Sequence, residues 1–361
     1  MMNKKVLIFG AGAIGRGFLA PLLFKYGYKI SFVDKDKKLI KKLKKRLIYT
    51  AAEINKKKYK LIKIKINEAF SLNEKIEVEK YDLVFCCVGP NESKKIENKF
   101  KNAKVVISCE NDFFSPYYLK KISKNKNIYF GIPDVITSNT APSKLLKIDD
   151  LTTVTEQGIL VLEKGNYNLN KNIKQLTKKN LEIHWRSKLF IHNAPHAILA
   201  YLGFLNKYKF IHDAMGNKNI CKIVLGAMNE ITNGIVNAKY VPKLFANKYK
   251  KKEINRFKNK LLYDPILRVA REPIRKLGKE NRIILSLRVA QWNNKLPKNT
   301  ATGVKAALNF FNKNDKESVY LQKLRKKYGD SQVLEKICGI EQTDPLNDFC
   351  LSQNITVFNK K

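Results

Sequence analysis

Three side chains able to move a proton or polarise an oxygen fall within the nine residues Lys188-Leu-Phe-Ile-His-Asn-Ala-Pro-His196. They are Lys188, Asn193 and His196. Burial in a medium of low dielectric constant lowers the pKa of a lysine towards working pH, so that it can take up and return a hydroxyl proton. An asparagine can donate to an oxygen on which charge develops, and a histidine can bond a substrate hydroxyl or steady the lysine. The segment predicts alcohol–ketone redox chemistry that needs no metal.

The same residues are also typical of the start of a helix. Asn193 would then cap the helix and Pro195 would occupy its first turn. His192 and His196 would be ordinary polar residues. The segment alone leaves both interpretations open, and the N-terminus favours the first.

A glycine-rich turn near the N-terminus lies between an apolar strand, expected at 5–9, and an apolar helix, expected at 18–26. The turn reads G-x-G-x-x-G, from Gly10 to Gly15. Gly10 permits the tight turn, Gly12 lets the backbone approach a pyrophosphate, and Gly15 lets the helix pack on the strand. The N-terminus of the helix offers amide donors to the phosphates. The alternative is a glycine-rich turn in an α/β protein that binds nothing.

Asp34 follows a second expected strand, 29–33, and lies 19 residues after Gly15. A carboxylate at this place would bond the ribose hydroxyls and repel a 2′-phosphate, which favours NAD over NADP. The predicted cofactor-binding residues of this region are Gly10, Ala11, Gly12, Ala13, Ile14, Gly15 and Asp34.

Further candidates follow later expected strands, at the edge of the sheet where a dinucleotide would cross. Val88 and Gly89 end the strand expected at 82–88, and Glu110 and Asn111 follow the strand expected at 104–109. We expect these four residues to contact the cofactor. The alternative is that both segments are simple turns.

The length of 361 residues suggests two domains. We expect an α/β dinucleotide-binding domain of the Rossmann type at 1–180 and a mostly α-helical domain at 181–361. Strands at 152–156 and 159–162 would extend the sheet as a mixed sheet. Helical periodicity prevails after about residue 180. It predicts helices at 222–231, 265–276, 282–293, 302–312 and 316–327.

The formal net charge of +40 is compatible with nucleic-acid or membrane binding. The lysines are spread along the whole chain, however, so we expect neither partner. Six cysteines show no CxxC motif and no metal-ligand spacing, so we expect free thiols and no metal site. Glycines interrupt the apolar N-terminal segment, so we expect a cytoplasmic protein without an export signal.

The chain resembles the polyol-specific long-chain dehydrogenases. Lys188, Asn193 and His196 match the K-x-x-x-x-N-x-x-H signature of that family at every fixed position. Other similar segments follow in order over nearly the whole chain: Phe9–Phe18, Val88–Pro90, Cys109–Asn111, Val224–Met228, Arg256–Asn259 and Arg268–Leu277.

The resemblance implies a metal-free, NAD-dependent dehydrogenase with its active site between the two domains. Lys188 would be the acid/base, Asn193 would polarise the reacting oxygen, and His196 would contact substrate. The implied reaction interconverts mannitol 1-phosphate and fructose 6-phosphate, and we expect a monomer. Two alternatives stay open. One is the same chemistry on a free polyol or a sugar acid, and the other is an inactive dinucleotide-binding sensor or interaction protein.

The sequence departs from the family in one loop. Residues 136–139 read Ile-Thr-Ser-Asn where relatives usually carry an Asp-Arg pair, and Asp134 stands where some relatives assist the oxyanion. Arg268, Arg271 and Arg275 would share one face of the helix expected at 265–276, although Pro273 should end or kink it. We predict that Asp134 and these arginines bind substrate, the arginines through its phosphate. The alternative is that the arginines pair with Asp264 and Glu272 or face solvent.

Overall fold

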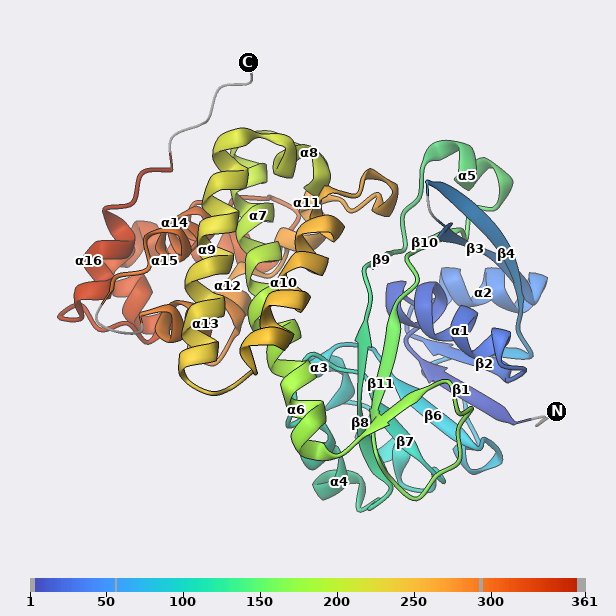
Figure 1. Ribbon diagram of the computed structural model, residues 1–361. Helices are drawn as coiled ribbons and strands as arrows, with labels where there is room; N and C mark the ends of the chain where they lie inside the picture. Colours follow the sequence, from blue (N-terminus) through green and yellow to red (C-terminus); the bar gives the residue numbers. More distant parts are fainter. Residues whose placement is uncertain (1–3, 56, 292–294, 356–361) are drawn as a thin grey trace. The chain divides into compact units, whose positions relative to one another are not determined.

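The computed structural model describes residues 4–55, 57–291 and 295–355 (Figure 1). The chain divides into two compact units. Unit 1 comprises Met1–Trp185 with Leu261–Tyr263, and unit 2 comprises Arg186–Lys260 with Asp264–Lys361.

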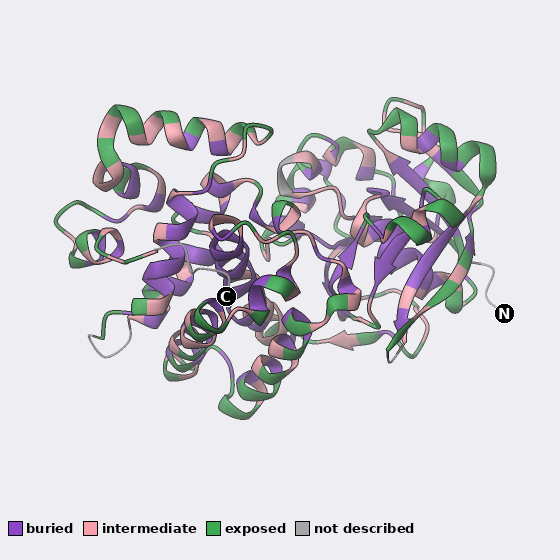
Figure 2. Cartoon of the chain, turned by 90° about the horizontal axis from the view of Figure 1, so that it is seen from above, coloured by how far each residue is buried: buried purple, intermediate pink, exposed green. Residues whose placement is uncertain are grey.

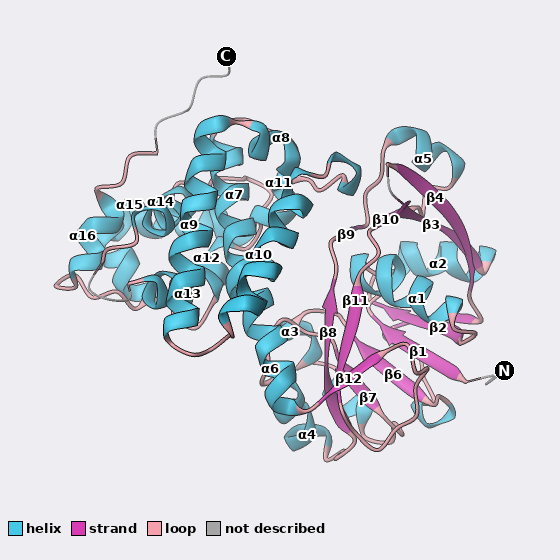
Figure 3. Ribbon diagram, in the orientation of Figure 1, coloured by secondary structure: helices cyan, strands magenta, loops and turns pink. Residues whose placement is uncertain are grey.

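Unit 1 is built on an eight-stranded sheet with the strand order β12-β11-β8-β7-β6-β1-β2-β5 (Figure 3). Its strands are β1 Lys5–Phe9, β2 Lys29–Asp34, β5 Glu68–Ser71, β6 Leu83–Cys86, β7 Val106–Ser108, β8 Ile128–Asp134, β11 Ile159–Glu163 and β12 Lys174–Leu176. All neighbouring strands are parallel except β8 and β11, which are antiparallel. The Rossmann-type sheet with a mixed extension is confirmed, but only the strand predicted at 159–162 joins it as β11, and the strand predicted at 152–156 does not.

A second, four-stranded sheet has the order β4-β3-β10-β9. Its strands are β3 Ile48–Asn55, β4 Lys58–Lys65, β9 Thr137–Ser138 and β10 Thr153–Thr155. β3 and β4 form the long antiparallel hairpin seen in Figure 1. β9 belongs to this sheet, so residues 137–138 are part of a strand.

The helices of unit 1 are α1 Ala20–Lys25, α2 Lys37–Arg46, α3 Pro90–Ser93, α4 Ser115–Ser123, α5 Ser143–Ile148 and the first part of α6 Lys178–Ser187. Of these, α1 and α2 contribute to the hydrophobic cluster on one face of the large sheet, and α4 contributes to the cluster on the other face. In β1, Ile8 belongs to one hydrophobic cluster, while Leu7 and Phe9 belong to another. This burial on both faces is why the parallel strands read as uninterrupted apolar runs, and Figure 2 shows the strands as the buried centre of the unit.

Unit 2 is helical (Figure 3). Its helices are α7 Ala194–Leu205, α8 Ile211–Gly216, α9 Lys218–Asn237, α10 Lys243–Lys258, α11 Ile266–Ala270, α12 Pro273–Leu277, α13 Arg282–Ala290, α14 Lys298–Leu308, α15 Lys316–Val333 and α16 Pro345–Leu351. Residues 194–203 of α7 are buried on every side, as expected for a helix that is apolar all round. Among the described residues, no helix is both long and apolar enough to cross a bilayer.

The prediction of one helix at 265–276 is wrong. α11 ends at Ala270, Arg271 has the extended ψ angle of 154°, and Glu272 is left-handed with φ of 58°. α12 then begins at Pro273. A proline has no N–H to donate and disfavours a helical conformation in the residue before it, so the helix breaks here.

Candidate active site and cofactor turn

Glycine is required at two positions of the cofactor turn. Gly10 has φ of +98°, and a Cβ there would lie 2.7 Å from the carbonyl oxygen of Cys87. A Cβ on Gly15 would lie 1.9 Å from the carbonyl oxygen of Gly10. Gly12 differs, because a Cβ there would meet no atom within 4 Å. Its backbone faces open space, which fits the close approach of a pyrophosphate.

The helix that follows the turn begins with a π-helical segment, Gly15–Leu19. The N–H of Ala20 donates to the carbonyl of Gly15, five residues earlier, which is the hydrogen bond of a π-helix. Pro21 comes next and has no N–H of its own. A π-helical turn costs few ordinary helical hydrogen bonds at this place, because the proline could not have donated one in any case.

Asp34 stands at the end of β2 and contacts the turn directly. Its Oδ2 accepts from the N–H of Ala11 at 2.7 Å, and its Oδ1 accepts from the N–H of Asp36 at 2.9 Å. Each carboxylate oxygen has a further lone pair, so Asp34 can also accept from ribose hydroxyls. Its ribose-binding role stays a prediction.

Arg16 fixes the same turn from inside the protein. The side chain is buried, and its Nε donates to the carbonyl of Ala11 at 2.6 Å. One terminal nitrogen donates to the carbonyl of Leu151 at 2.5 Å. Arg16 therefore orders the turn through backbone carbonyls and is not available to a phosphate.

Glu110 is buried and bonds the loop after β6. Its Oε1 accepts from the N–H of Gly89 at 3.0 Å and from the thiol of Cys86 at 3.7 Å. Burial raises the pKa of Glu110 to about 7, although the Gly89 hydrogen bond opposes the rise. Gly89 has φ of +104° and open space around it, while Asn111 is exposed. The geometry gives Glu110 a clear role in positioning Gly89, and its direct contact with a cofactor stays a prediction.

The other cofactor candidates line the turn as well. Ala13 accepts from Thr137 Oγ1 at 3.3 Å, and Ile14 and Val88 pack against the two cores of the unit. Thr137 Oγ1 also donates to Val154, at 2.9 Å. Residues 136–139, which include β9 and lack the Asp-Arg pair of relatives, thus pack against the cofactor turn. Asp134, at the end of β8, is buried, and its substrate-binding role stays a prediction.

The segment Lys188–Asn193 is a second π-helical segment, inserted between α6 and α7. The N–H of Ala194 donates to the carbonyl of Leu189, and Pro195 follows. Asn193 has helical angles, φ of −63° and ψ of −38°, and its side chain makes no cap hydrogen bond. The interpretation of Asn193 as the cap of a new helix is therefore wrong, since the chain is already helical before it.

The helical periods of this region predict that the three candidate catalytic residues lie on one side. In a π-helix, residues i and i+5 lie one turn apart, so Asn193 stands one turn beyond Lys188. Five α-helical steps of about 100° would instead place Asn193 about 140° away around the axis. His196 follows Asn193 by three residues, which again is the same side of a helix. The wide turn thus suits the five-residue spacing between the lysine and the asparagine.

His196 is oriented by partners from elsewhere in unit 2. Its Nε2 lies 2.9 Å from Oδ2 of Asp264, an ion-pair distance, but the ring N–H is not aimed well enough for a hydrogen bond. The ring stacks on Phe257 with centroids 5.1 Å apart. Burial raises the pKa of Asp264, but the charge of Arg268 and the contact with His196 outweigh burial and lower it to about 2. Asp264 is thus a fixed negative charge beside His196.

His192 bonds a different buried acid. Its Nδ1 lies 2.6 Å from Oε2 of Glu253, and the other oxygen of Glu253 accepts from Arg256 at 2.7 Å. Burial lowers the pKa of His192 to about 4, and the charge of Glu253 opposes this only in part. His192 is therefore neutral at pH 7, and its bond to Glu253 ties the π-helical segment to α10.

Two of the three arginines predicted to bind phosphate already have acidic partners. Arg268 Nε donates to Asp264 at 3.0 Å, and Arg275 Nε donates to Glu272 at 2.8 Å. Arg271 is exposed. The break at Glu272 also means that the three do not share one helical face. The alternative pairing with Asp264 and Glu272 is confirmed, and the phosphate-binding role stays a prediction.

Comparison with known proteins assigns the family. The mannitol dehydrogenase Rossmann domain matches residues 4–128, and the mannitol dehydrogenase C-terminal domain matches residues 180–340. The chain is 32% identical to a mannitol-1-phosphate 5-dehydrogenase of Buchnera aphidicola subsp. Acyrthosiphon pisum (strain Tuc7), over 93% of this chain and 94% of the relative. The chain belongs to the mannitol dehydrogenase family. The predicted family resemblance is confirmed.

Two further comparisons agree in extent and fold. A mannitol-1-phosphate 5-dehydrogenase of Caldanaerobacter subterraneus subsp. tengcongensis is 31% identical over 95% of both chains. The solved Pseudomonas fluorescens mannitol 2-dehydrogenase, in complex with NAD and D-mannitol, superimposes with a TM-score of 0.76. That comparison covers 97% of this chain and 90% of the solved one at 16% identity, so it shows the shared fold.

The partners of the two histidines were not predicted as site residues. Glu253 is the only acidic residue of α10 and stands in a lysine-rich run. It shares one buried face with Tyr249, Arg256 and Phe257, which follow the period of a helix. That periodicity was a usable signal. Nothing in the local sequence connects Asp264 with His196, because the two residues are brought together only by the fold of unit 2.

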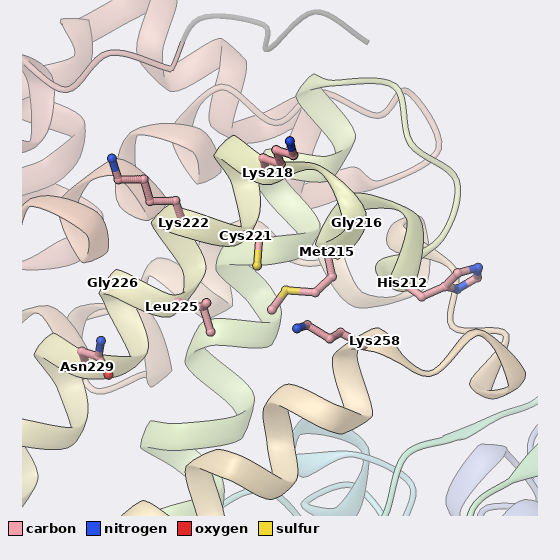
Figure 4. Close-up of a pocket in the computed structure, with 10 residues that line it drawn as sticks. All are labelled: His212, Met215, Gly216, Lys218, Cys221, Lys222, Leu225, Gly226, Asn229 and Lys258. Carbon is pink, nitrogen blue, oxygen red and sulfur yellow. The ribbon is translucent and has the colours of Figure 1, made fainter. Parts of the chain in front are cut away.

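A separate pocket of about 750 Å³ lies between α8, α9 and α10 (Figure 4). Met215, Cys221 and Leu225 form its apolar part, and Lys258 reaches towards Met215. Lys218 and Lys222 on its rim are exposed. None of the predicted catalytic or cofactor-binding residues lines it, so the pocket is distinct from the candidate active site.

Proposed function

We propose that this protein is an NAD-dependent oxidoreductase that interconverts mannitol 1-phosphate and fructose 6-phosphate. The observation that carries the chemistry is the π-helical segment Lys188–Asn193 directly before α7. Its wide turn would bring Lys188, Asn193 and, three residues further on, His196 to one side of the helix. The substrate is supported by relatives named mannitol-1-phosphate 5-dehydrogenase that match at 30–32% identity over more than nine-tenths of the chain.

Unit 1 binds the dinucleotide in this proposal. NAD, when bound, accepts a hydride from the polyol carbon, and NADH returns one to the ketone. The open backbone at Gly12 receives the pyrophosphate, and Asp34 accepts from the ribose hydroxyls. Glu110 holds Gly89 in place at the same edge of the sheet.

Unit 2 handles the proton and the oxygen. Lys188 takes the hydroxyl proton during oxidation and returns it during reduction. The carboxamide of Asn193 donates to the reacting oxygen and stabilises the negative charge that develops on it. His196 contacts a substrate hydroxyl, with its ring held by Asp264 and Phe257. All three groups are prepositioned on a helix, which lowers the entropic cost of reaching the transition state.

A second candidate keeps the chemistry but changes the substrate to a free polyol or a sugar acid. This candidate is favoured because Arg268 and Arg275, two of the side chains predicted to bind phosphate, already donate to acidic partners. The absence of the Asp-Arg pair from residues 136–139 points the same way.

We further propose that the enzyme is a cytoplasmic monomer that acts on a small molecule and not on nucleic acid. All six cysteines are free thiols, which suits a reducing compartment. Lysines are distributed along the whole sequence and do not gather in one segment. Light scattering after gel filtration tests the monomer, and a dimer at working concentration would contradict it.

The experiment that tests the proposed function follows NADH absorbance with fructose 6-phosphate, fructose and a hexuronate as separate substrates. We expect rapid oxidation of NADH only with fructose 6-phosphate. Equal rates with fructose or the hexuronate would favour the second candidate. NADH binding without turnover on any of the three would contradict the oxidoreductase assignment.

A further inference from the structure

Three polar side chains in unit 2 are buried from three different helices. Lys276 of α12 is 4% exposed, Arg282 of α13 is 9% exposed, and Tyr201 of α7 is fully buried. A buried ammonium or guanidinium is costly unless it meets an opposite charge or strong acceptors. The partners of these three groups therefore decide whether the cluster is purely structural.

These side chains are poorly partnered within the part of the chain that the structure describes. The ammonium group of Lys276 makes no hydrogen bond and no ion pair there. The guanidinium of Arg282 donates only to the side chain of its neighbour Asn281, at 3.2 Å. The hydroxyl of Tyr201 has no partner, and neither has that of Ser286, one turn along α13 from Arg282.

Other buried arginines behave differently. Arg16 donates to two backbone carbonyls, and Arg256 pairs with Glu253. Burial alone therefore does not leave cations without acceptors in this protein. Arg282 interacts electrostatically with both Lys276 and Tyr201, so the three groups form one cluster. This cluster is distinguished by its unused donors.

The acidic residues near the cluster are already engaged. Glu272 accepts from Arg275 Nε. Asp315 accepts from the backbone N–H of Glu272 and of Ser318, and Glu317 accepts from the backbone N–H of Arg275. These carboxylates hold α12 and α15 in place and do not bond Lys276 or Arg282.

The electrostatic environment reflects this shortage of negative charge. Burial lowers the pKa of Lys276 well below its ordinary value, and the charges of Arg282 and Arg275 lower it further. Burial, with the charge of Arg275, lowers the pKa of Arg282 to about 10. An anion placed among these groups would relieve both effects.

We propose that Lys276, Arg282 and Tyr201 form an oxyanion site that binds a phosphate group. The planar guanidinium can donate two parallel hydrogen bonds to phosphate oxygens, the ammonium adds a compact charge, and the phenol donates a further bond. Ser286 adds a hydroxyl on the next turn of α13. The phosphate comes from the substrate if the proposed function holds, and a free phosphate ion has the same chemistry.

The first test measures phosphate binding directly, on the full chain without substrate. Inorganic phosphate should raise the unfolding temperature of the native protein and give a dissociation constant by calorimetry. Lys276→Met should bind phosphate roughly tenfold more weakly or worse, since hydrogen bonds to charged groups are lost. Tyr201→Phe removes only the hydroxyl and keeps the ring packed on Phe310, so it should fold and bind phosphate several-fold more weakly.

A matched control and an independent readout separate binding from folding. Lys279→Met removes the same charge from an exposed position three residues away and should leave phosphate binding unchanged. Without phosphate, Lys276→Met should unfold at the native temperature or above it, because an unpaired buried amine is replaced by an apolar side chain. A lysine that stabilised the fold through a bond would give the opposite result.

Kinetics then identify the source of the phosphate. If it belongs to the substrate, inorganic phosphate competes with fructose 6-phosphate, and Tyr201→Phe raises the KM for fructose 6-phosphate but not for fructose. If a free ion binds, phosphate stabilises the protein without competing. The site is disproved if phosphate neither binds nor stabilises the native protein, or does so equally in Lys276→Met and Tyr201→Phe. Failure of the native protein to reduce fructose 6-phosphate would overturn the proposed function instead, and calorimetry would still report the site.

Discussion

The cofactor turn of unit 1 and the Lys188–His196 stretch of unit 2 share one backbone arrangement. Each contains a π-helical segment, Gly15–Leu19 in the first and Lys188–Asn193 in the second. Each segment is followed by Ala-Pro at the start of an α-helix, Pro21 in α1 and Pro195 in α7. In both, the proline falls where a missing N–H is tolerated.

The two regions differ in which atoms carry the proposed function. In the cofactor turn these are backbone atoms, and side chains must be absent at Gly10 and Gly15, as the short Cβ distances there show. In the Lys188–His196 stretch the backbone only sets the direction of the side chains. Glycines of the cofactor turn can therefore be replaced only where a Cβ would meet open space. In the Lys188–His196 stretch, we expect substitutions that keep the spacing of the three reacting side chains to be tolerated, and loss of any one of them to abolish activity.

The largest effect is expected for Gly15→Ala. The new Cβ would lie 1.9 Å from the carbonyl oxygen of Gly10, which must be displaced, so unit 1 should lose roughly 3 kcal/mol or more of stability. Thermal unfolding measures the loss. Gly12→Ala is the matched control, because a Cβ there meets nothing within 4 Å. That variant should fold normally and bind NADH roughly tenfold more weakly, equivalent to about 1.4 kcal/mol. A well-folded Gly15→Ala would contradict the steric account.

Lys188→Ala tests the second region through a side chain. We expect turnover to fall by about 100-fold or more, the usual scale for a lost general acid/base, with NADH binding little changed. Initial rates with fructose 6-phosphate give the first quantity and NADH fluorescence gives the second. Full activity in the variant would remove Lys188 from the mechanism.

The contrast between the regions also explains what could be predicted from sequence. The requirements of the cofactor turn are local, so Gly10, Gly12, Gly15 and their flanking strand and helix could be placed from the motif alone. Lys188, Asn193 and His196 could be selected by residue type and spacing. Their geometry could not, because the sequence is typical of a helix that begins at Asn193, whereas the chain is already helical from Lys178 and forms a π-helical turn at Lys188–Asn193.

Tertiary partners lay beyond the reach of sequence reasoning. Asp264 meets His196 across a separation of 68 positions, and Glu253 meets His192 across 61. The prediction that three arginines share one face of a helix at 265–276 was wrong, because the helix ends before Pro273 and a new one begins there. A kink alone would have kept the helical register of the arginines. Glu110 was selected correctly as a residue of the sheet edge, but its bond to Gly89 depends on the approach of two neighbouring strands.

Glu110 links stability to pH in the cofactor region. Its pKa is about 7 in the folded protein against an ordinary value of 4.5, so the folded state holds the proton more tightly. Stability from this group is therefore fully present below about pH 4.5 and is lost as the pH rises towards 7.

Glu110→Gln keeps an acceptor for Gly89 and should be more stable than the native protein by roughly 2 kcal/mol at pH 8. The advantage should shrink between pH 7 and 5, as thermal unfolding across pH will show. The exposed Glu79→Gln is the control and should show no such trend. An unchanging difference would disprove the buried titration.

The smallest effect is expected for Asp34→Ser, which changes a side chain that bonds the backbone of the cofactor turn. One oxygen of Asp34 already accepts from Ala11, so the substitution should weaken the binding of both cofactors. The ratio of NADH to NADPH affinity is the informative quantity. We expect this ratio to fall several-fold, because like-charge repulsion of a 2′-phosphate is removed. Asp36→Ser removes a carboxylate two residues away, which caps α2 through Lys38 and Leu39. Because serine caps a helix about as well as aspartate does, Asp36→Ser should change the stability by less than about 0.5 kcal/mol and leave the ratio unchanged. If the native protein prefers NADPH, or if Asp34→Ser leaves the ratio unchanged, Asp34 holds the turn without selecting the cofactor.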